Sequence, residues 1–224
     1  MGIYLRVAIE IFRKDLQIEA RSKRIFNTAA IFSLLVIVVF AFSFAQTFVD
    51  LTVIGSGALW VSFVFAGTFS VIQGAASEEQ DAALDGLLLA PVDRSAIYAG
   101  KVASSTVFIA TVELLTLGFV VVFLDYAPPV AMFPAFVGVI IAASFGFSAV
   151  GVSLSLLTVK SQLRELLLPM LLIPLVIPVL LAGISLTRSL TTGSSSHSWI
   201  ILLLAYDGIL FLSGFMTFEY IVEG

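Results

Sequence analysis

The sequence predicts an all-α integral membrane protein with six transmembrane helices, and two observations lead to this prediction. The first is composition: of the 224 residues, 60% are hydrophobic and only 12% are charged, which leaves too little polar surface to cover a water-soluble protein of this size. The second is run length, because a spanning helix needs about 20 mostly apolar residues and the chain contains six such runs. The runs lack the period-two alternation of an outer-membrane β-barrel, so helices are the remaining way to span a bilayer.

The chain begins with an amphipathic segment, residues 3–24, which we expect to form a helix. Its apolar residues share one helical face: Leu5, Ile9, Phe12 and Leu16. Charged and polar residues occupy the other face, and a helix of this kind lies in the plane of the membrane interface. The alternative is an amphipathic extension that packs on a partner protein.

Six apolar runs follow, and we predict that each crosses the bilayer once. They occupy residues 26–45, 53–74, 97–123, 131–157, 166–186 and 199–217. The fourth run carries Gly138, Ala142 and Gly146 at four-residue spacing, a pattern that lets another helix approach closely. The fifth contains three prolines, each of which removes a backbone donor and bends a helix unless neighbouring groups compensate.

Positive charge is distributed unequally between the two sides of this topology. Ten of the eleven Lys and Arg residues lie on one side, and only Arg188 lies on the other. Because the positive-inside rule assigns the Lys- and Arg-rich side to the cytoplasm, we expect both termini and the segments 75–96 and 158–165 to be cytoplasmic. The loops on the opposite side are too short to hold a folded domain, so we expect the whole chain, 1–224, to form one transmembrane domain.

The segment 75–96 is the longest hydrophilic stretch between two spans, and it is rich in carboxylates although the topology places it on the basic side. A short amphipathic stretch within it ends at Pro91, and Asp93 is placed to cap a helix that begins with Ser95. The residues alone leave two interpretations open. The segment is either a surface helix offered to a cytoplasmic partner or a solvated loop whose charges keep it out of the bilayer.

The same region carries a long and specific motif. It consists of Glu78-Glu79, of Leu84-Asp-Gly-Leu-Leu-Leu-Ala-Pro-Val-Asp-Arg-Ser-Ala-Ile-Tyr98, and of Gly100-Lys101. Together with Lys14-Asp15-Leu16 near the start and Phe218-Glu-Tyr220 near the end, it closely resembles the CcmB family. That family is the permease component of the cytochrome c maturation ABC transporter, often called the haem exporter. The resemblance implies an ABC-2 (type II exporter-like) permease fold in the bacterial cytoplasmic (inner) membrane.

The resemblance also implies a role for the segment between the second and third spans. In permeases of this exporter class, that segment contains a coupling helix that rests in a groove of the ATPase subunit. The coupling role carried over in this way falls on Glu78, Glu79, Asp81, Asp85, Leu87, Leu88, Pro91 and Arg94. The implied partners are an ABC ATPase, a haem-handling membrane protein, the haem chaperone of cytochrome c maturation, membrane lipid and a second permease copy, with no nucleic acid.

The chain itself is expected to be non-catalytic and to hold no cofactor or metal. Its Gly100-Lys101 pair is followed by Val102, and Ser95 stands where a phosphate loop has its first glycine. Haem ligation within one copy is not expected, because the one histidine, His197, lies in an outer loop and the chain has no cysteine. The resemblance implies haem as cargo of the complex, either exported or released on its chaperone.

Two acidic residues fall inside predicted spans, where charges are costly and therefore are functional candidates. Glu113 lies near the middle of the third span, and Asp207 lies within the sixth. Each is able to bond to a neighbouring helix, shape a transport path or remain protonated. For Glu113 we expect a bond between helices.

Other functions remain open at the level of sequence. A generic ABC-2 permease for another hydrophobic substrate would share every feature above. A secondary transporter would have inverted repeats and broken helices, and no clear repeat is present. A membrane-embedded enzyme needs a convergent catalytic set, which a chain with one histidine and no cysteine does not readily supply.

Overall fold

The computed structural model is a helical bundle, and it describes residues 2–45, 51–80, 93–158, 161, 163–192 and 197–223. The elements in chain order are α1 (Gly2–Ser22), α2 (Arg24–Phe44), α3 (Leu51–Gln80), α5 (Arg94–Leu124), the short 3-10 helix η1 (Val130–Met132), α6 (Phe133–Leu157), α7 (Arg164–Thr192) and α8 (His197–Glu223). Within these described residues, six helices are long and apolar enough to cross a membrane. The predicted fold class is confirmed, and the chain is a multi-pass membrane protein.

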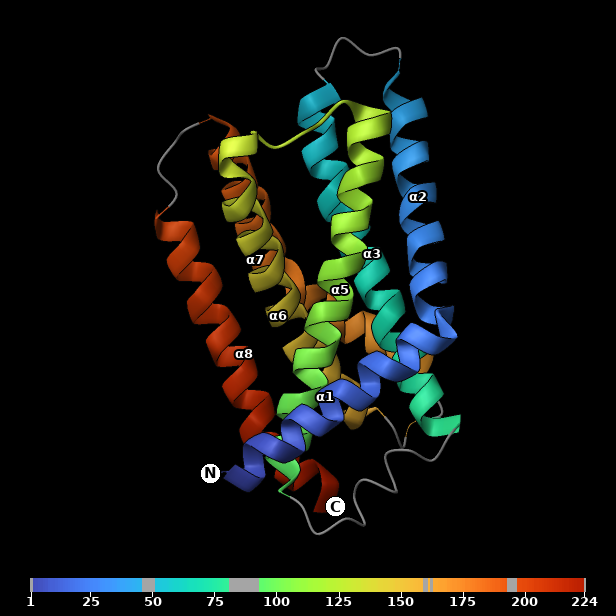
Figure 1. Cartoon of the computed structure of the whole chain (residues 1–224), viewed down its shortest axis with the longest axis vertical. Coiled ribbons are helices and arrows are strands. Elements are labelled where there is room, and N and C mark those ends of the chain that lie inside the picture. The colour runs from blue at the N-terminus through green and yellow to red at the C-terminus, as the bar shows by residue number, and fades with distance from the viewer. Residues whose placement is uncertain are drawn as a thin grey trace.

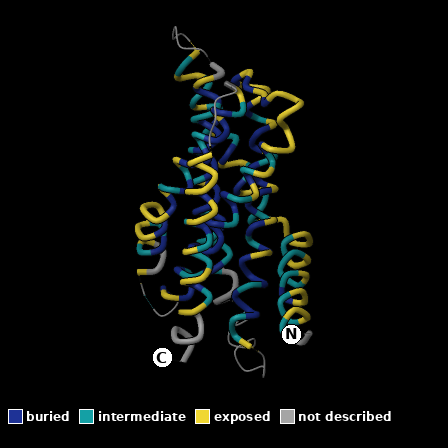
Figure 2. The backbone as a smooth tube through the Cα atoms, turned by 90° about the vertical axis from the view of Figure 1, so that its left-hand side faces the viewer, coloured by how far each residue is buried: buried dark blue, intermediate teal, exposed yellow. Residues whose placement is uncertain are grey.

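The six long helices run side by side, and α1 lies across one end of the bundle (Figure 1). We call this end the α1 end. Helix α5 packs against α1, α2, α3, α6 and α8, so it connects α1 to most of the bundle. Buried residues lie along the inner faces of the helices, and exposed residues cover the outside (Figure 2). Many of the exposed side chains are large and apolar, for example Phe42, Val122 and Met170, as expected for a surface that contacts lipid.

The turn between α1 and α2 is sharp and is fixed by two residues. Lys23 adopts a left-handed backbone conformation with φ of 51°, which changes the direction of the chain within one residue. The side chain of Glu19 then accepts a hydrogen bond of 2.8 Å from the backbone N–H of Phe26, one of the groups that the start of α2 leaves without a helical partner. The amphipathic helix predicted over 3–24 therefore ends at Ser22, and α2 begins directly afterwards.

Helix α1 crosses α5 at Gly100. A Cβ atom at this position would lie 2.7 Å from the backbone oxygen of Ala8 and 2.9 Å from Cβ of Ile11. Ile11 is buried by the contact, whereas Leu5 and Ile9 of the predicted apolar face are exposed. The helix thus contacts the bundle through a residue outside the predicted apolar stripe and turns part of that stripe outwards, where a membrane interface would cover it.

Gly100→Leu is expected to lift α1 from the bundle, because the new side chain occupies the space of the Ala8 backbone and of Ile11. Trypsin cleavage after Arg13 in the purified, detergent-solubilised protein should then accelerate at least tenfold. The matched control is Gly118→Leu on the same helix, since Gly118 is exposed and has open space at its Cβ. Equal cleavage rates in the two variants would contradict close packing at Gly100.

The largest core cluster is centred on aromatic rings between α3, α6 and α7. Trp60 is 0% exposed, and its indole Nε1 donates a 3.1 Å hydrogen bond to Oγ1 of Thr187. Phe63 packs edge-on against Trp60 and against Phe147, with ring centroids 5.3 Å apart in both pairs. The ring of Trp60 rests on Gly183 of α7, so these two helices approach closely at this level.

Several helix boundaries differ from the predicted spans. Helix α3 continues to Gln80, past the predicted end at 74, and α7 continues to Thr192, past 186. Hydropathy marks where a helix leaves the apolar layer, and the backbone hydrogen bonds continue beyond that point. Helix α5 begins at Arg94, one residue before the predicted Ser95.

The predicted small-residue stripe on α6 is only partly a packing face. Gly146 lies directly against the Asp207 side chain of α8, with the Cγ atom 2.8 Å from where a Cβ would stand. Gly138, two turns earlier, is exposed and has open space at its Cβ. Close approach between α6 and α8 therefore depends on one glycine of the stripe.

Candidate functional site

The predicted coupling segment joins two helices at the α1 end. The ends of α3 and α5 that flank residues 81–92 lie there, together with both termini (Figure 1). Arg94 opens α5, and Glu78 and Glu79 belong to the last turn of α3, although their side chains lie outside the description. The remaining coupling candidates lie outside the described residues: Asp81, Asp85, Leu87, Leu88 and Pro91. Their coupling role stays a prediction.

The start of α5 is capped as the sequence predicts. The Asp93 carboxylate accepts a 3.0 Å hydrogen bond from the backbone N–H of Ser95, and the Ser95 hydroxyl also donates to it. Tyr4 of α1 lies beside this cap: burial raises the pKa of its hydroxyl, a hydrogen bond with Ser95 lowers it, and the Asp93 carboxylate raises it. The predicted coupling segment therefore ends at the capped start of α5, and α1 covers this start.

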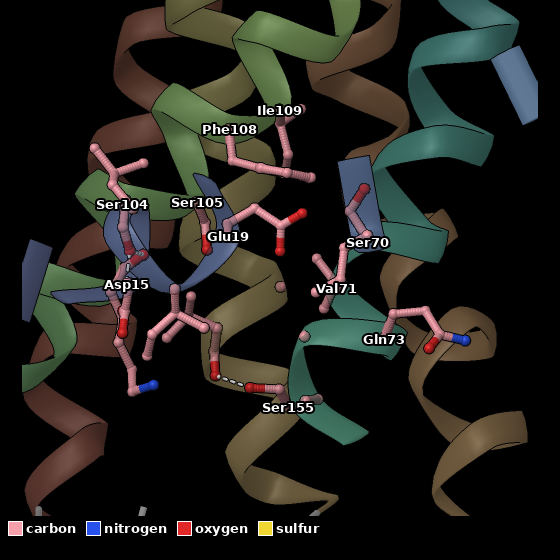
Figure 3. A pocket seen from close by; sticks show the side chains of 18 of the residues that line it. Asp15, Glu19, Ser70, Val71, Gln73, Ser104, Ser105, Phe108, Ile109 and Ser155 are labelled. Carbon is pink, nitrogen blue, oxygen red and sulfur yellow. Dashed lines mark hydrogen bonds between the residues drawn. The ribbon is translucent and has the colours of Figure 1, made fainter. Parts of the chain in front are cut away.

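A cavity of about 360 Å³ lies beneath α1 at this end, and we call it the interfacial cavity (Figure 3). Its walls are the second half of α1, the first turn of α2, the last turns of α3, the first half of α5 and the end of α6. Charged side chains line it from three of these helices: Lys14, Asp15, Glu19, Arg24 and Lys101. Hydroxyl groups from Ser70, Ser104, Ser105 and Ser155 add to its polar lining.

The charges of the interfacial cavity are partly paired with one another. Lys14 and Asp15 form an ion pair of 2.9 Å, and Ser104 of α5 donates a 3.2 Å hydrogen bond to the same carboxylate. Lys101 is only 4% exposed, which is rare for a lysine. The sequence analysis found Asp15 and Lys101 within the family resemblance, but not that they line one cavity, because they belong to helices far apart in the chain.

Glu113 is buried between α5 and α3, and its side chain is 1% exposed. It borders a gap lined by Phe63, Ala66, Gly67 and Ser70 of α3. Ser70 and Ile109 line both this gap and the interfacial cavity, so Glu113 lies just beyond the inner end of the cavity. Within the described part of the chain, Oε1 of Glu113 has no hydrogen-bond partner, and the predicted bond between helices is not found for that oxygen.

Asp207 is buried in a different contact, between α8 and α6. It is 3% exposed and packs on Gly146. Neither of its carboxylate oxygens has a hydrogen-bond partner among the residues that the structure describes. Glu113 and Asp207 are therefore two separate buried carboxyl groups, each in its own helix contact.

Comparison with protein families gives one decisive match. The model of the family described as CcmB protein matches residues 6–219, which is nearly the whole chain. The chain belongs to the CcmB family. No curated protein matches it at a significant level. Membership confirms the resemblance seen in the sequence and identifies this CcmB-family chain as a permease component of the cytochrome c maturation ABC transporter, a membrane subunit of a complex with other maturation components.

Proposed function

We propose that this chain converts ATP hydrolysis by a partner ATPase into movement of its spans, through contact with the segment 75–96. The movement serves to export haem or to release the haem-loaded chaperone from a haem-handling membrane protein. In this proposal the α1 end faces the cytoplasm, in agreement with the positive charge of the segments that gather there.

The length and packing of α3 and α5 support the proposal most directly. They contain 30 and 31 residues, and helices of that length extend about 45 Å, more than the roughly 30 Å of the apolar layer. They flank residues 81–92 and pack against each other. A displacement of the segment would therefore act on two continuous helices that reach across the membrane.

The packing of α5 also explains how such a displacement would spread. Its first turns are held under α1 at Gly100 and beside Tyr4, and further along it packs on α2, α3, α6 and α8. Close-packed helices move as units and do not deform continuously. A shift at the start of α5 would thus change the arrangement of most of the bundle.

Reversing the charge of the coupling segment tests the contact with the ATPase. The triple variant Glu79→Lys, Asp81→Lys and Asp85→Lys is expected to retain at least tenfold less ATPase when the tagged chain is purified in mild detergent, because the acidic residues would meet a basic groove. The matched control reverses three other acidic residues of the α1 end: Glu10→Lys, Glu219→Lys and Glu223→Lys. Unchanged ATPase recovery from the first triple, with normal membrane insertion, would remove the coupling assignment.

The same purification identifies the cargo system. Mass spectrometry of the wild-type preparation is expected to find an ATPase together with haem-handling maturation proteins. An ATPase without maturation proteins would instead favour a permease for another hydrophobic substrate. Reproducible absence of any ATPase from a stable preparation would contradict the proposal as a whole.

A further inference from the structure

We propose that Glu113 is a proton-binding site inside the bundle, and that its proton exchanges with the α1 end through the interfacial cavity. Three buried serine hydroxyls, those of Ser62, Ser144 and Ser148, belong to the same site. It goes beyond the proposed function, and its test follows the proton itself, without reference to transport. Three features lead to it: the apolar surroundings of the carboxyl group, the unpartnered hydroxyls at the same helix contact, and the continuity between the gap at Glu113 and the cavity.

The surroundings of Glu113 suit a neutral carboxyl group and not a carboxylate. The side chain is 1% exposed, and its Oε1 has no hydrogen-bond partner within the described part of the chain. The other residues that line the gap beside it are uncharged: Phe63, Ala66, Gly67, Ser70, Ile109 and Val112. As these side chains enclose it, the gap has no space for a water molecule. Burying a carboxylate with neither a cation nor water beside it is very costly, so Glu113 binds a proton in this arrangement.

The charged groups of the neighbouring helices lie elsewhere. Those of α1 and α2 line the interfacial cavity, together with Lys101, which is twelve residues before Glu113 and therefore about 18 Å away along α5. Near Glu113, α2 contributes the uncharged Ala29 to the packing between α3 and α5. Asp207 of α8 lies against the glycine that precedes Phe147 on α6, and so on a different face of that helix. The proton on Glu113 therefore takes the place that a cationic side chain would have in an ion pair.

Three buried hydroxyl groups occur at the same helix contact. Ser62 lies one turn from Ala66, which lines the gap, and residues four apart share a helix face. Ser144 and Ser148 are one turn apart on α6, and Phe147 between them contacts two residues of the gap lining. All three serines are 0% exposed, and their Oγ atoms have no partner among the described residues. Because buried polar atoms are almost always hydrogen-bonded to protein or to ordered water, these hydroxyls indicate a site that admits water when the helices move apart.

A path from this site to the α1 end runs past Ser70. Ser70 and Ile109 line both the gap at Glu113 and the interfacial cavity, and in Figure 3 Ile109 lies at the upper end of the cavity and Ser155 at the lower. The Ser70 hydroxyl donates a 2.6 Å hydrogen bond to the backbone oxygen of Ala66, so its lone pairs are left to accept from water or from a carboxyl group. The cavity, of about 360 Å³, is large enough for several water molecules of about 30 Å³ each. A small separation of α3 and α5 would join gap and cavity and let the proton exchange.

Infrared spectroscopy of the purified full chain tests the bound proton. At neutral pH, where an exposed glutamate is ionised, the wild type is expected to show a carboxylic-acid C=O stretch that Glu113→Gln lacks. Glu113→Asp, which keeps the carboxyl group, should retain the band at a shifted frequency and so separates loss of the proton from loss of the fold. The band should be the same in sodium and potassium chloride. A band unaffected by Glu113→Gln would overturn the site, and disappearance of the band in sodium would overturn a proton as the ligand in favour of a sodium ion.

Exchange of the same band in D2O tests the path. Gly74 lines the interfacial cavity, and a Cβ at this position meets no atom within 4 Å, so Gly74→Leu is expected to fill the cavity without disturbing the fold. Deuterium uptake by Glu113 should then be about tenfold slower than in the wild type, because water is displaced from the path. Gly57→Leu is the matched control, since Gly57 lies on the same helix with equally open space but does not line the cavity. Equal exchange rates in the two variants would overturn the path through the cavity.

Removing one of the hydroxyls tests their part in the site. Ser148→Ala is expected to slow deuterium uptake by Glu113 about threefold, because a hydroxyl both donates to and accepts from water next to the carboxyl group. The thermal midpoint should not fall, since this hydroxyl has no partner to lose among the described residues. Ser213→Ala, at an exposed position of α8, is the control. Equal uptake in Ser148→Ala and Ser213→Ala would remove the hydroxyl from the proton-binding site.

Discussion

Gly183→Val is expected to destabilise the bundle by about 3 kcal/mol, at the upper end of the usual cost of overpacking a core. A Cβ at Gly183 would lie 2.5 Å from two ring carbons of Trp60, far inside van der Waals contact. The indole has no room to retreat: it is 0% exposed, it is hydrogen-bonded to Thr187 at 3.1 Å, and Phe63 packs against it. Helices α3 and α7 would therefore have to separate.

The measurement is the thermal midpoint of the detergent-purified protein, followed by size-exclusion chromatography after heating. Gly208→Val is the matched control, because it introduces the same β-branched residue into a helix at a position with open space. Combining Gly183→Val with Trp60→Leu should recover part of the loss, since the smaller side chain vacates the ring's position. A midpoint for Gly183→Val equal to that of Gly208→Val would contradict the close contact between α3 and α7.

The spans and one helix start could be predicted because each depends on local chemistry. The thickness of the bilayer sets the length of an apolar run, so the number of spans follows from counting. Asp93 caps α5 as predicted because an acidic residue before a helix satisfies its first N–H groups whatever the rest of the fold does. The helix ends at Gln80 and Thr192 were missed because no apolar boundary marks them.

The contacts between helices could not be predicted, since they depend on how each helix is rotated about its own axis. In a span that is apolar on every side, the sequence carries little information about which face turns inwards. Gly138 and Gly146 look equivalent in the sequence, yet only Gly146 meets another helix closely. The interfacial cavity was missed for the same reason: Glu19 and Lys101 come together only through the crossing of α1 over α5.

The largest functional effect is expected from Asp207→Ala, which should reduce cytochrome c maturation at least tenfold without loss of stability. Leaving a buried polar group without a hydrogen bond costs about 1–3 kcal/mol. Both carboxylate oxygens of Asp207 are buried and have no hydrogen-bond partner among the described residues. Removing the carboxyl group relieves this cost and roughly offsets the packing that is lost. The thermal midpoint should therefore stay the same or rise, while maturation is measured as the yield of holo-cytochrome c in cells that depend on the variant.

The Asp207→Ala variant is expected to lose maturation activity while its thermal midpoint stays the same or rises. A carboxyl group that costs stability inside a membrane is expected to persist where the protein's work requires it, so stability and function should separate at this position. Ser213→Ala, an exposed polar position of the same helix, is the control and should change neither. Normal maturation with Asp207→Ala would remove Asp207 from the functional candidates. A lowered thermal midpoint would instead show that the carboxyl group stabilises the fold. The loss of maturation in the Asp207→Ala variant would then follow from unfolding.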